Sequence, residues 1–217
     1  MLKRSFIAIV ASLGLVAAPA VAQSPSESAH GVIEKVEARN PSLKTFQTRL
    51  HVDVRMLNFP FLAPKLDGSA YFKRPSNYEV VFDRVPSYAK GFKRLFADVG
   101  DAASWERENN VSLVGSNSLN GRPMLVLRLT KKVYSDQVDH ADIYVDASSY
   151  QVAQMEWYYR NGGKIVMTQN YKTEGPFNVI ATQHAEIAIP HVHAVADATY
   201  GQYETNVAVS DEVFSNK

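Results

Sequence analysis

The sequence predicts an α+β domain that is mostly β, in which a strongly curved, open antiparallel sheet, an incomplete barrel, is closed by short helices. Three observations lead to this prediction. Residues 46–56 alternate between apolar and polar side chains, about eight strand-like runs in all lie between turn residues, and two other segments show the period of an amphipathic helix. Strands that are apolar on one side fold so that these sides face one another or face the helices.

Residues 1–22 are typical of a secretory signal peptide. Lys3 and Arg4 form a basic start, residues 6–16 an apolar run too short to span a bilayer, and residues 20–22 a small-residue cleavage pattern that ends at Ala22. The mature protein would then be residues 23–217, which suits one domain with a sizeable core. The chain has no cysteine, so we expect a periplasmic protein without disulfides or thiolate metal ligands.

A short amphipathic helix is expected at the start of the mature chain. Its apolar residues have the spacing i, i+3, i+4, i+7, and Asn40-Pro41 ends the run. These residues are Ala29, Val32, Ile33 and Val36.

The long half-buried strand predicted for residues 46–56 has its apolar face at Phe46, Leu50, Val52, Val54 and Met56, and only Thr48 interrupts it. We expect Leu50, Val52 and Val54 to line an apolar cavity.

An apolar connection broken by two prolines, residues 57–66, follows this strand and is expected to lie as a loop at one end of the sheet. The hydrophobic part, Phe59 to Leu62, has two interpretations: a buried hairpin end, or a lip that touches membrane or cargo.

Two short strands are predicted next, at Ser69–Lys73 and Tyr78–Phe82, after a turn at Asp67-Gly68. Because Pro75 cannot donate to a sheet ladder, Lys73 and Arg74 should lie at the rim of the sheet.

A second amphipathic helix is predicted beyond Pro86, with Lys90, Lys93 and Arg94 off its apolar side. It either packs as an ordinary covering helix or acts as a mobile lid. Its apolar stripe is Phe92, Leu95, Phe96 and Val99.

The remaining chain alternates strands with turns, including a hairpin turn at Gly162-Gly163. The predicted strands are residues 124–130, 141–146, 152–159, 164–171, 184–189 and 195–203. A wide curved sheet lined by aliphatic and aromatic residues can enclose more space than its own side chains fill, which suits an apolar ligand.

Composition narrows the class of partner. Without Lys3 and Arg4, the 23 basic side chains fall to 21, against 22 acidic ones, and the charges are interspersed. Such a balance argues against nucleic acid as a general partner.

One motif resembles a known family. The run Gly68-Ser69-Ala70-Tyr71-Phe72-Lys73-Arg74-Pro75-Ser76-Asn77-Tyr78 is similar to the Gly-x-x-aromatic-x-Lys-Arg-Pro-x-x-aromatic signature of LolA-like outer-membrane lipoprotein-sorting proteins, and residues 203–214 resemble the closing segment of such sequences. The resemblance implies a periplasmic carrier that holds acyl chains of a lipoprotein or lipid in an open β-barrel with a helical lid.

The same resemblance implies site residues. Arg74 matches the family arginine that bonds to the lid, Tyr78 an aromatic of the cavity mouth, and Tyr71 an aromatic of the same strand. From the residues alone, the solvated rim residue is the preferred interpretation of Arg74, and the two tyrosines can also be ordinary strand core. The sequence departs from the family after Phe82, where a helix replaces the expected Asp-Gly turn and Leu-Trp-aromatic strand, and this leaves the cargo open.

No catalytic site or cofactor is predicted. His184, His191 and His193 lie near one another in sequence but form an incomplete metal site, and we expect no bound metal. His140 and His51 have acidic neighbours, yet no nucleophile elbow or phosphate-binding loop accompanies them.

The predicted function is therefore a monomeric, non-enzymatic periplasmic carrier of an acylated lipoprotein or lipid. Its further partners would be inner- and outer-membrane transport proteins, with transient membrane contact. A lipid-sensing regulatory protein of the same fold is the alternative, and a lipid hydrolase is disfavoured because no nucleophile-base pair is recognisable.

Overall fold

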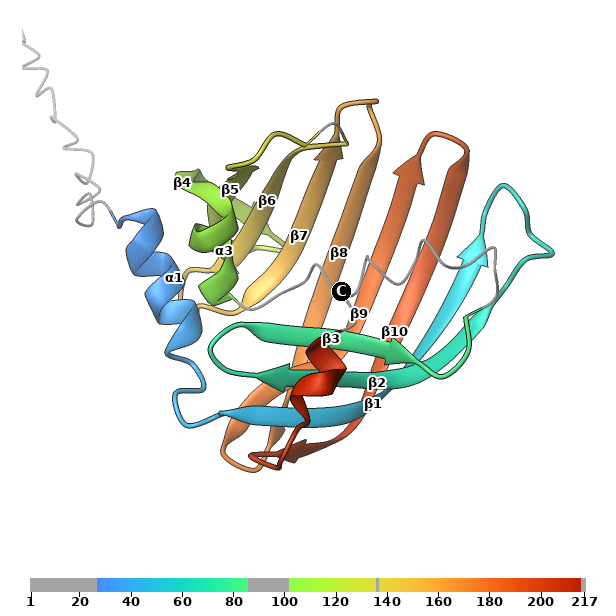
Figure 1. Cartoon of the computed structure of the whole chain (residues 1–217). Coiled ribbons are helices and arrows are strands. Elements are labelled where there is room, and N and C mark those ends of the chain that lie inside the picture. Colours follow the sequence, from blue (N-terminus) through green and yellow to red (C-terminus); the bar gives the residue numbers. More distant parts are fainter. Residues whose placement is uncertain (1–26, 86–101, 136, 216–217) are drawn as a thin grey trace, which may run out of the picture.

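The structure is a computed structural model that describes residues 27–85, 102–135 and 137–215 (Figure 1). The predicted signal peptide, residues 1–22, lies outside the described residues. So does the predicted helix with Phe92, Leu95 and Phe96.

One antiparallel sheet of ten strands dominates the fold, in the order β3-β2-β1-β10-β9-β8-β7-β6-β5-β4. It is strongly curved, and β3 and β4 are its two edges (Figure 1). The strands are β1 (Thr45–Met56), β2 (Lys65–Lys73), β3 (Asn77–Phe82), β4 (Asn109–Leu119), β5 (Arg122–Lys131), β6 (Val138–Asp146), β7 (Val152–Tyr159), β8 (Lys164–Glu174), β9 (Phe177–Ile189) and β10 (Val192–Thr205). The predicted mostly β, curved and open sheet is confirmed.

Two short helices lie at one end of the concave side, α1 (Ala29–Glu37) and α3 (Ala102–Glu108), and a 3-10 helix, η2 (Asp211–Phe214), packs at β3 (Figure 1). The Ser28 hydroxyl caps α1 by accepting from Gly31 N at 3.0 Å. Val32 and Ile33 are buried, and Ala29 and Val36 pack against the core, as the helical spacing predicts.

The concave face is mainly apolar because strand register brings apolar residues opposite one another. In β1, Leu50, Val52 and Val54 are buried, which confirms the predicted alternation, and Val52 faces both Leu66 and Ala198. In the middle of the sheet, Met167 faces Ala185 on one side and Met155 on the other.

The convex face is charged and polar. Arg49 pairs with Asp83 at 2.6 Å, and His51 with Asp67 at 2.7 Å. On β5 and β6, the Arg128 guanidinium donates two bonds to Asp142, at 2.8 and 2.7 Å. The sheet therefore has one face built for apolar contact and one for water.

The turn predicted at Asp67-Gly68 is wrong, because both residues lie within β2. Gly68 is there for close packing: a Cβ on it would come within 2.5 Å of Val81 O and 2.9 Å of Phe82 Cα. The connection after β1 is accordingly shorter than predicted, since β2 begins at Lys65 and Leu66 is buried.

Three elements were not predicted: α3, the edge strand β4 and the 3-10 helix η2. Helix α3 has seven residues, too few for a helical period to be visible, and β4 consists mainly of Asn, Ser and Gly around a few aliphatic residues. Strand β9 is also longer than predicted and begins at Phe177. Within the described residues, no helix is long and apolar enough to cross a membrane.

Candidate functional site

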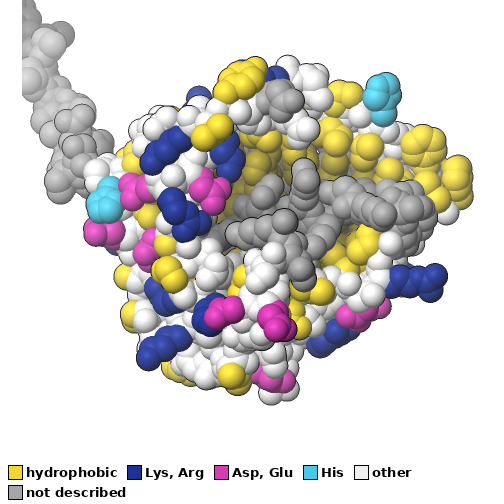
Figure 2. Space-filling view, viewed as in Figure 1, with side chains coloured by type: hydrophobic (Ala, Val, Ile, Leu, Met, Phe, Trp, Pro, Cys, Tyr) yellow, Lys and Arg dark blue, Asp and Glu magenta, His cyan; other side chains and the backbone are white. Residues whose placement is uncertain are grey.

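Two adjoining hollows lie between the helices and the concave face of the sheet, with volumes of about 340 Å³ and about 190 Å³. Tyr78 and Trp105 line both of them, so these two rings stand between the larger hollow and the smaller hollow. Figure 2 shows hydrophobic side chains lining the inside of the curved sheet near this end.

The larger hollow has an apolar floor and a polar rim. Its rim includes Arg107 and Lys131, and Lys131 pairs with Glu108 at 3.1 Å. Arg107 donates to the Ser76 hydroxyl. The floor is formed by Trp105, Leu129, Ala141, Ile143, Met155 and Trp157. Polar and charged side chains make up half of the lining residues, so the hollow combines an apolar floor with a polar border, as suits an amphiphilic ligand.

The smaller hollow is enclosed by α1 and by the ends of the central strands. Aromatic rings meet here: Phe46 stacks on Phe72 with centroids 5.3 Å apart and meets Tyr203 edge to face at 5.1 Å. Its apolar lining also includes Val36, Leu43, Ala102, Val152 and Ile180.

A chain of hydrogen bonds crosses the apolar face beside the hollows. The Tyr78 hydroxyl lies 3.3 Å from that of Tyr200, which donates to Gln183 Oε1 at 2.6 Å. Gln183 Nε2 donates to Gln169 Oε1 at 3.1 Å, and Gln169 Nε2 donates to Val152 O at 2.9 Å. We call these five residues the polar belt. It joins β3, β10, β9, β8 and β7 through four polar side chains and the Val152 carbonyl, which satisfy one another.

The low polarity around these groups is visible in the tyrosine pKa values. Burial raises the pKa of Tyr78 to about 12 and, with Tyr78 beside it, raises that of Tyr200. The ring of Tyr78 lines both hollows while its hydroxyl points inward to Tyr200. Burial also raises the pKa of Tyr171, which donates to Val152 O at 3.1 Å, to about 12.

Arg74 connects the rim of the sheet to the end of α1. Its Nε donates to Leu43 O at 2.6 Å, and a terminal nitrogen donates to Asn40 O at 2.9 Å. Asn40 is held in turn by Asn178, through bonds of 2.8 and 3.0 Å. Arg74 also lines the smaller hollow, so it is partnered rather than solvated, and its role in cargo handling stays a prediction.

The other predicted site residues fall on different sides of the sheet. Tyr78 lines both hollows, whereas Tyr71 lies on the convex face, opposite Gln47 and Glu79 in the register. The aromatic of β2 that does face inward is Phe72. The predicted cavity residues Leu50, Val52 and Val54 are buried on the concave face but do not line either hollow.

The histidines predicted to form an incomplete metal site do not lie in the hollows. Among residues 27–85, 102–135 and 137–215, no cluster of three or more His, Cys, Asp or Glu side chains could hold a metal ion. His184 instead pairs with Asp197 at 2.6 Å on the convex face.

Sequence reasoning missed the residues that shape the hollows most. Trp105 lies on the unpredicted α3, and Gln169 and Gln183 come together only through the pairing of β8 with β9. One pattern could have identified the glutamines, because each stands at an apolar position of an alternating strand.

Comparison with known proteins rests on structure alone, since no protein-family model and no curated protein matches the sequence. A LolA superfamily protein from Nitrosomonas europaea superposes with a TM-score of 0.65 at 14% identity, over 87% of this chain and 98% of that one. The chain has a LolA-like fold. The resemblance stated from the motif at residues 68–78 is thereby confirmed at the level of fold.

Two further solved structures share the LolA-like fold, each with a TM-score of 0.65. One, from Vibrio parahaemolyticus, is a domain named as an outer membrane lipoprotein-sorting protein, with 11% identity over 85% of this chain and 94% of that one. The other is a DUF1329 family protein from Desulfovibrio piger, with 10% identity over 88% of this chain and 98% of that one. At such identities the likeness establishes the fold, and the site must be argued from this chain's own residues.

Proposed function

We propose that this protein is a periplasmic carrier that binds acyl chains of a lipoprotein or lipid in the two hollows and moves them toward the outer membrane, without covalent chemistry. The observation that carries the proposal is the larger hollow, which has a volume of about 340 Å³ and a floor of six apolar side chains from α3 and three strands. A sheet that packed only against itself would close such a space.

The energetics suit reversible carriage. Burial of an acyl chain contributes about 0.8 kcal/mol per methylene relative to water, and the chain gains about as much per methylene in a bilayer, so exchange between the hollow and a membrane is close to balanced when the same number of methylenes is buried in each. The polar rim at Arg107 and Lys131 leaves room for a head group or a peptide at the edge while the chain lies on the floor.

Location and partners are part of the same proposal. The basic, apolar and small-residue pattern of residues 1–22 supports export to the periplasm with cleavage after Ala22. The solved domain named for outer membrane lipoprotein sorting shares the fold, which supports an acylated protein as cargo and membrane transport proteins as donor and acceptor.

Filling the larger hollow tests the proposal. Ala141 lies on its floor between Leu129 and Trp157, so Ala141→Phe places a ring in the unfilled space. The matched control is Ala188→Phe, at an exposed position on the convex face of β9. We expect wild type and A188F to bind an apolar fluorescent probe that phospholipid displaces, and A141F to bind it at least tenfold more weakly.

Native mass spectrometry of the protein from its own periplasm separates carriage from the regulatory alternative. A bound lipid or acylated protein supports carriage. An empty protein in a tight complex with another protein would favour a lipid-sensing regulator, and a folded wild type that takes up no probe would refute the cavity itself.

A further inference from the structure

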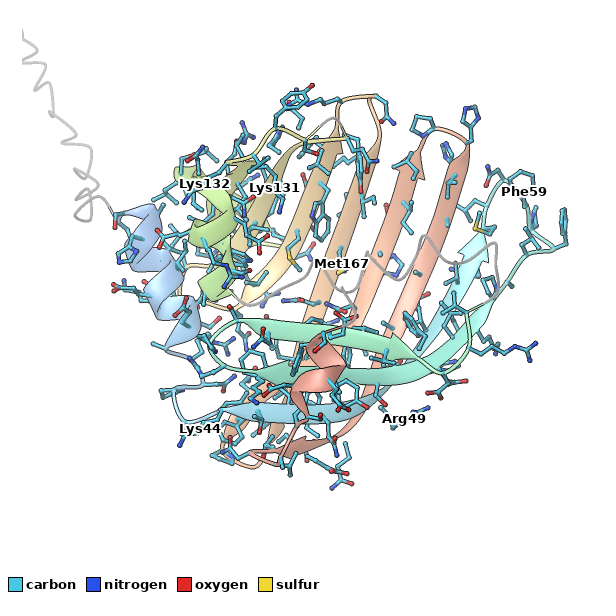
Figure 3. The ribbon with its side chains drawn as sticks, in the orientation of Figure 1. Lys44, Arg49, Phe59, Lys131, Lys132 and Met167 are labelled. Atoms are coloured by element: carbon cyan, nitrogen blue, oxygen red, sulfur yellow. The ribbon has the colours of Figure 1, made fainter. Side chains whose placement is uncertain are left out.

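Apolar side chains stand in solvent at the opposite end of the sheet from α1. In the loop between β1 and β2, Leu57 is 56% exposed, Phe59 43% and Phe61 81%. We call Leu57, Phe59, Pro60 and Phe61 the lip. Figure 3 places Phe59 far from Lys131 and Lys132 beside α3, and Figure 2 shows a hydrophobic cluster at the same edge of the molecule.

The backbone of the lip is held by hydrogen bonds rather than left loose. Leu62 N donates to Phe59 O at 2.8 Å and Met56 N to Leu62 O at 3.2 Å, which closes a tight turn. The rings of Phe59 and Phe61 meet edge to face with centroids 6.3 Å apart. The exposed rings are therefore presented by an ordered loop, and binding through them costs little conformational entropy.

A second hairpin supports the lip from the side. Leu57 N donates to His193 O at 2.7 Å, and Asn58 Nδ2 donates to His191 O at 2.9 Å. Both acceptors lie at the turn between β9 and β10, where His191 has a φ of 68°. The two hairpins thus form one surface.

Basic side chains predominate on this surface. Residues 54–65 and 187–195 contain no Asp or Glu, but they contain Arg55, Lys65, His191 and His193. Arg55, His191 and His193 are exposed, and Lys65 is exposed beside Asp53, at 3.4 Å. Aromatic side chains with cations around them match the interface of an anionic bilayer, where rings enter the head-group layer and cations meet phosphate.

We propose that the lip docks the protein on a membrane by inserting Phe59, Phe61 and Leu57 into the head-group layer of a bilayer that contains anionic phospholipid. The lip continues the concave apolar face, because Met56, Ala194 and Ile189 lie on that face at this end of β1, β10 and β9. Docking here places the apolar face of the sheet directly against the source or destination of an acyl chain.

Vesicle flotation tests the lip with a matched pair of variants. The test variant is Phe59→Ser with Phe61→Ser. The control is Val133→Ser with Tyr134→Ser, two side chains that are 82% and 77% exposed between β5 and β6. We expect wild type and control to float with vesicles of phosphatidylethanolamine and phosphatidylglycerol, and the F59S/F61S protein to bind at least tenfold more weakly. Binding should weaken for vesicles of phosphatidylcholine alone and at high salt.

Fluorescence at saturating vesicle concentration adds a reading of depth. In Phe61→Trp, the added tryptophan should shift to shorter wavelength with anionic vesicles and be quenched by lipids brominated near the head group. Circular dichroism of each variant checks that it is folded.

Three results would overturn the proposal: a folded wild type that does not bind vesicles, an equal loss in the V133S/Y134S control, or unchanged binding by F59S/F61S. Lip variants that lose only a protein partner would show that the lip is a protein-docking surface. The inference goes beyond carriage, since flotation includes no transfer step. Probe uptake without vesicle binding would refute the proposed docking by the lip and leave the proposed carrier function intact. Vesicle binding without probe uptake would refute the carrier function and leave the docking proposal intact.

Discussion

The two ends of the concave face use similar apolar side chains in opposite ways. At the helix-covered end, Val32, Ile33 and Trp105 are buried against the sheet around the two hollows. At the lip, Phe59 and Phe61 face water. Burial at the first end stabilises the fold, whereas the exposed rings at the second end contribute little to folding and, in the proposed docking, serve membrane binding. Stability and membrane contact should therefore respond to different mutations.

Trp105→Ala should cause the largest loss of stability and give the clearest contrast between the helix-covered end and the lip. The change removes a buried ring that lines both hollows, and we expect the free energy of unfolding to fall by about 3–5 kcal/mol. Urea denaturation measures it, with Phe61→Ala at the lip as the comparison. Equal, small losses in both variants would mean that the helix-covered end is not packed more tightly than the lip.

Alkaline pH should destabilise the end that holds the buried tyrosines. The pKa of Tyr78 and of Tyr171 is raised to about 12 in the folded protein, against 10.0 ordinarily. The unfolded chain therefore loses these protons first, so stability is intact below pH 10 and falls as the pH rises above it. At pH 12 each of these two tyrosines should lower the free energy of unfolding by about 2 kcal/mol.

Denaturation curves between pH 9 and 12 measure this loss. In Tyr78→Phe, the part of the loss that comes from Tyr78 should be absent. A wild-type curve that stays flat above pH 10 would show that these hydroxyls titrate as in water.

Arg74→Leu tests the connection between the sheet rim and α1. It removes two donors to the carbonyls of Asn40 and Leu43, and we expect a loss of about 1–3 kcal/mol in the free energy of unfolding. Under the proposed function, uptake of labelled lipid persists while its transfer to acceptor vesicles falls about tenfold. Arg49→Leu, on the convex face, is the control. Transfer at the wild-type rate in R74L would restrict Arg74 to a structural role.

The lip variant F59S/F61S should barely change stability. Both rings are exposed, so the free energy of unfolding should stay within about 0.5 kcal/mol of wild type. Thermal and urea denaturation check it. A larger loss would show that the lip contributes to the core and would weaken the contrast between the two ends.

The smallest expected effect is a pH-dependent change in the stability of α1, through its contact with α3. Glu106, 2.9 Å from His30 Nδ1, raises the pKa of His30 above its ordinary 6.5 by a hydrogen bond, and Glu34 adds to this. The stabilising contribution is therefore present below pH 6.5 and is lost as the pH rises through the raised pKa. Hydrogen exchange of α1 amides should be slower at pH 5.5 than at pH 8 relative to His30→Gln, and an identical pH response in that variant would contradict the prediction.

Local patterns in the sequence predicted much of the fold. The alternation in residues 46–56 predicted both the strand and its buried side, and the spacing of Val32 and Ile33 predicted α1. Asp67-Gly68 was misread as a turn because the close approach of Phe82 that requires a glycine depends on the neighbouring strand. Strand β4 was missed because an edge strand half in solvent needs few apolar residues.

The site was less predictable because it is made by long-range pairing. Tyr78 and Arg74 were identified through a local motif, and both line the smaller hollow. Gln183, Tyr200 and Gln169 meet only when β8, β9 and β10 pair in register, and the sequence contains no local sign of that meeting. The position of Trp105 could not be predicted because it lies on α3, which is too short for its helical period to be recognised in the sequence.

The unpaired edges of the sheet affect how far the size of the concave space can change. In the described sheet, β3 and β4 are the two ends of the strand order and are not paired with each other. A closed cylinder of strands has a girth fixed by its hydrogen bonds, but a sheet with two free margins can change its curvature while every ladder stays intact. Under the proposed function, cargoes of different thickness could then be accommodated by bending alone. The range of cargo sizes would be a mechanical property of this architecture, separate from the residues that line it.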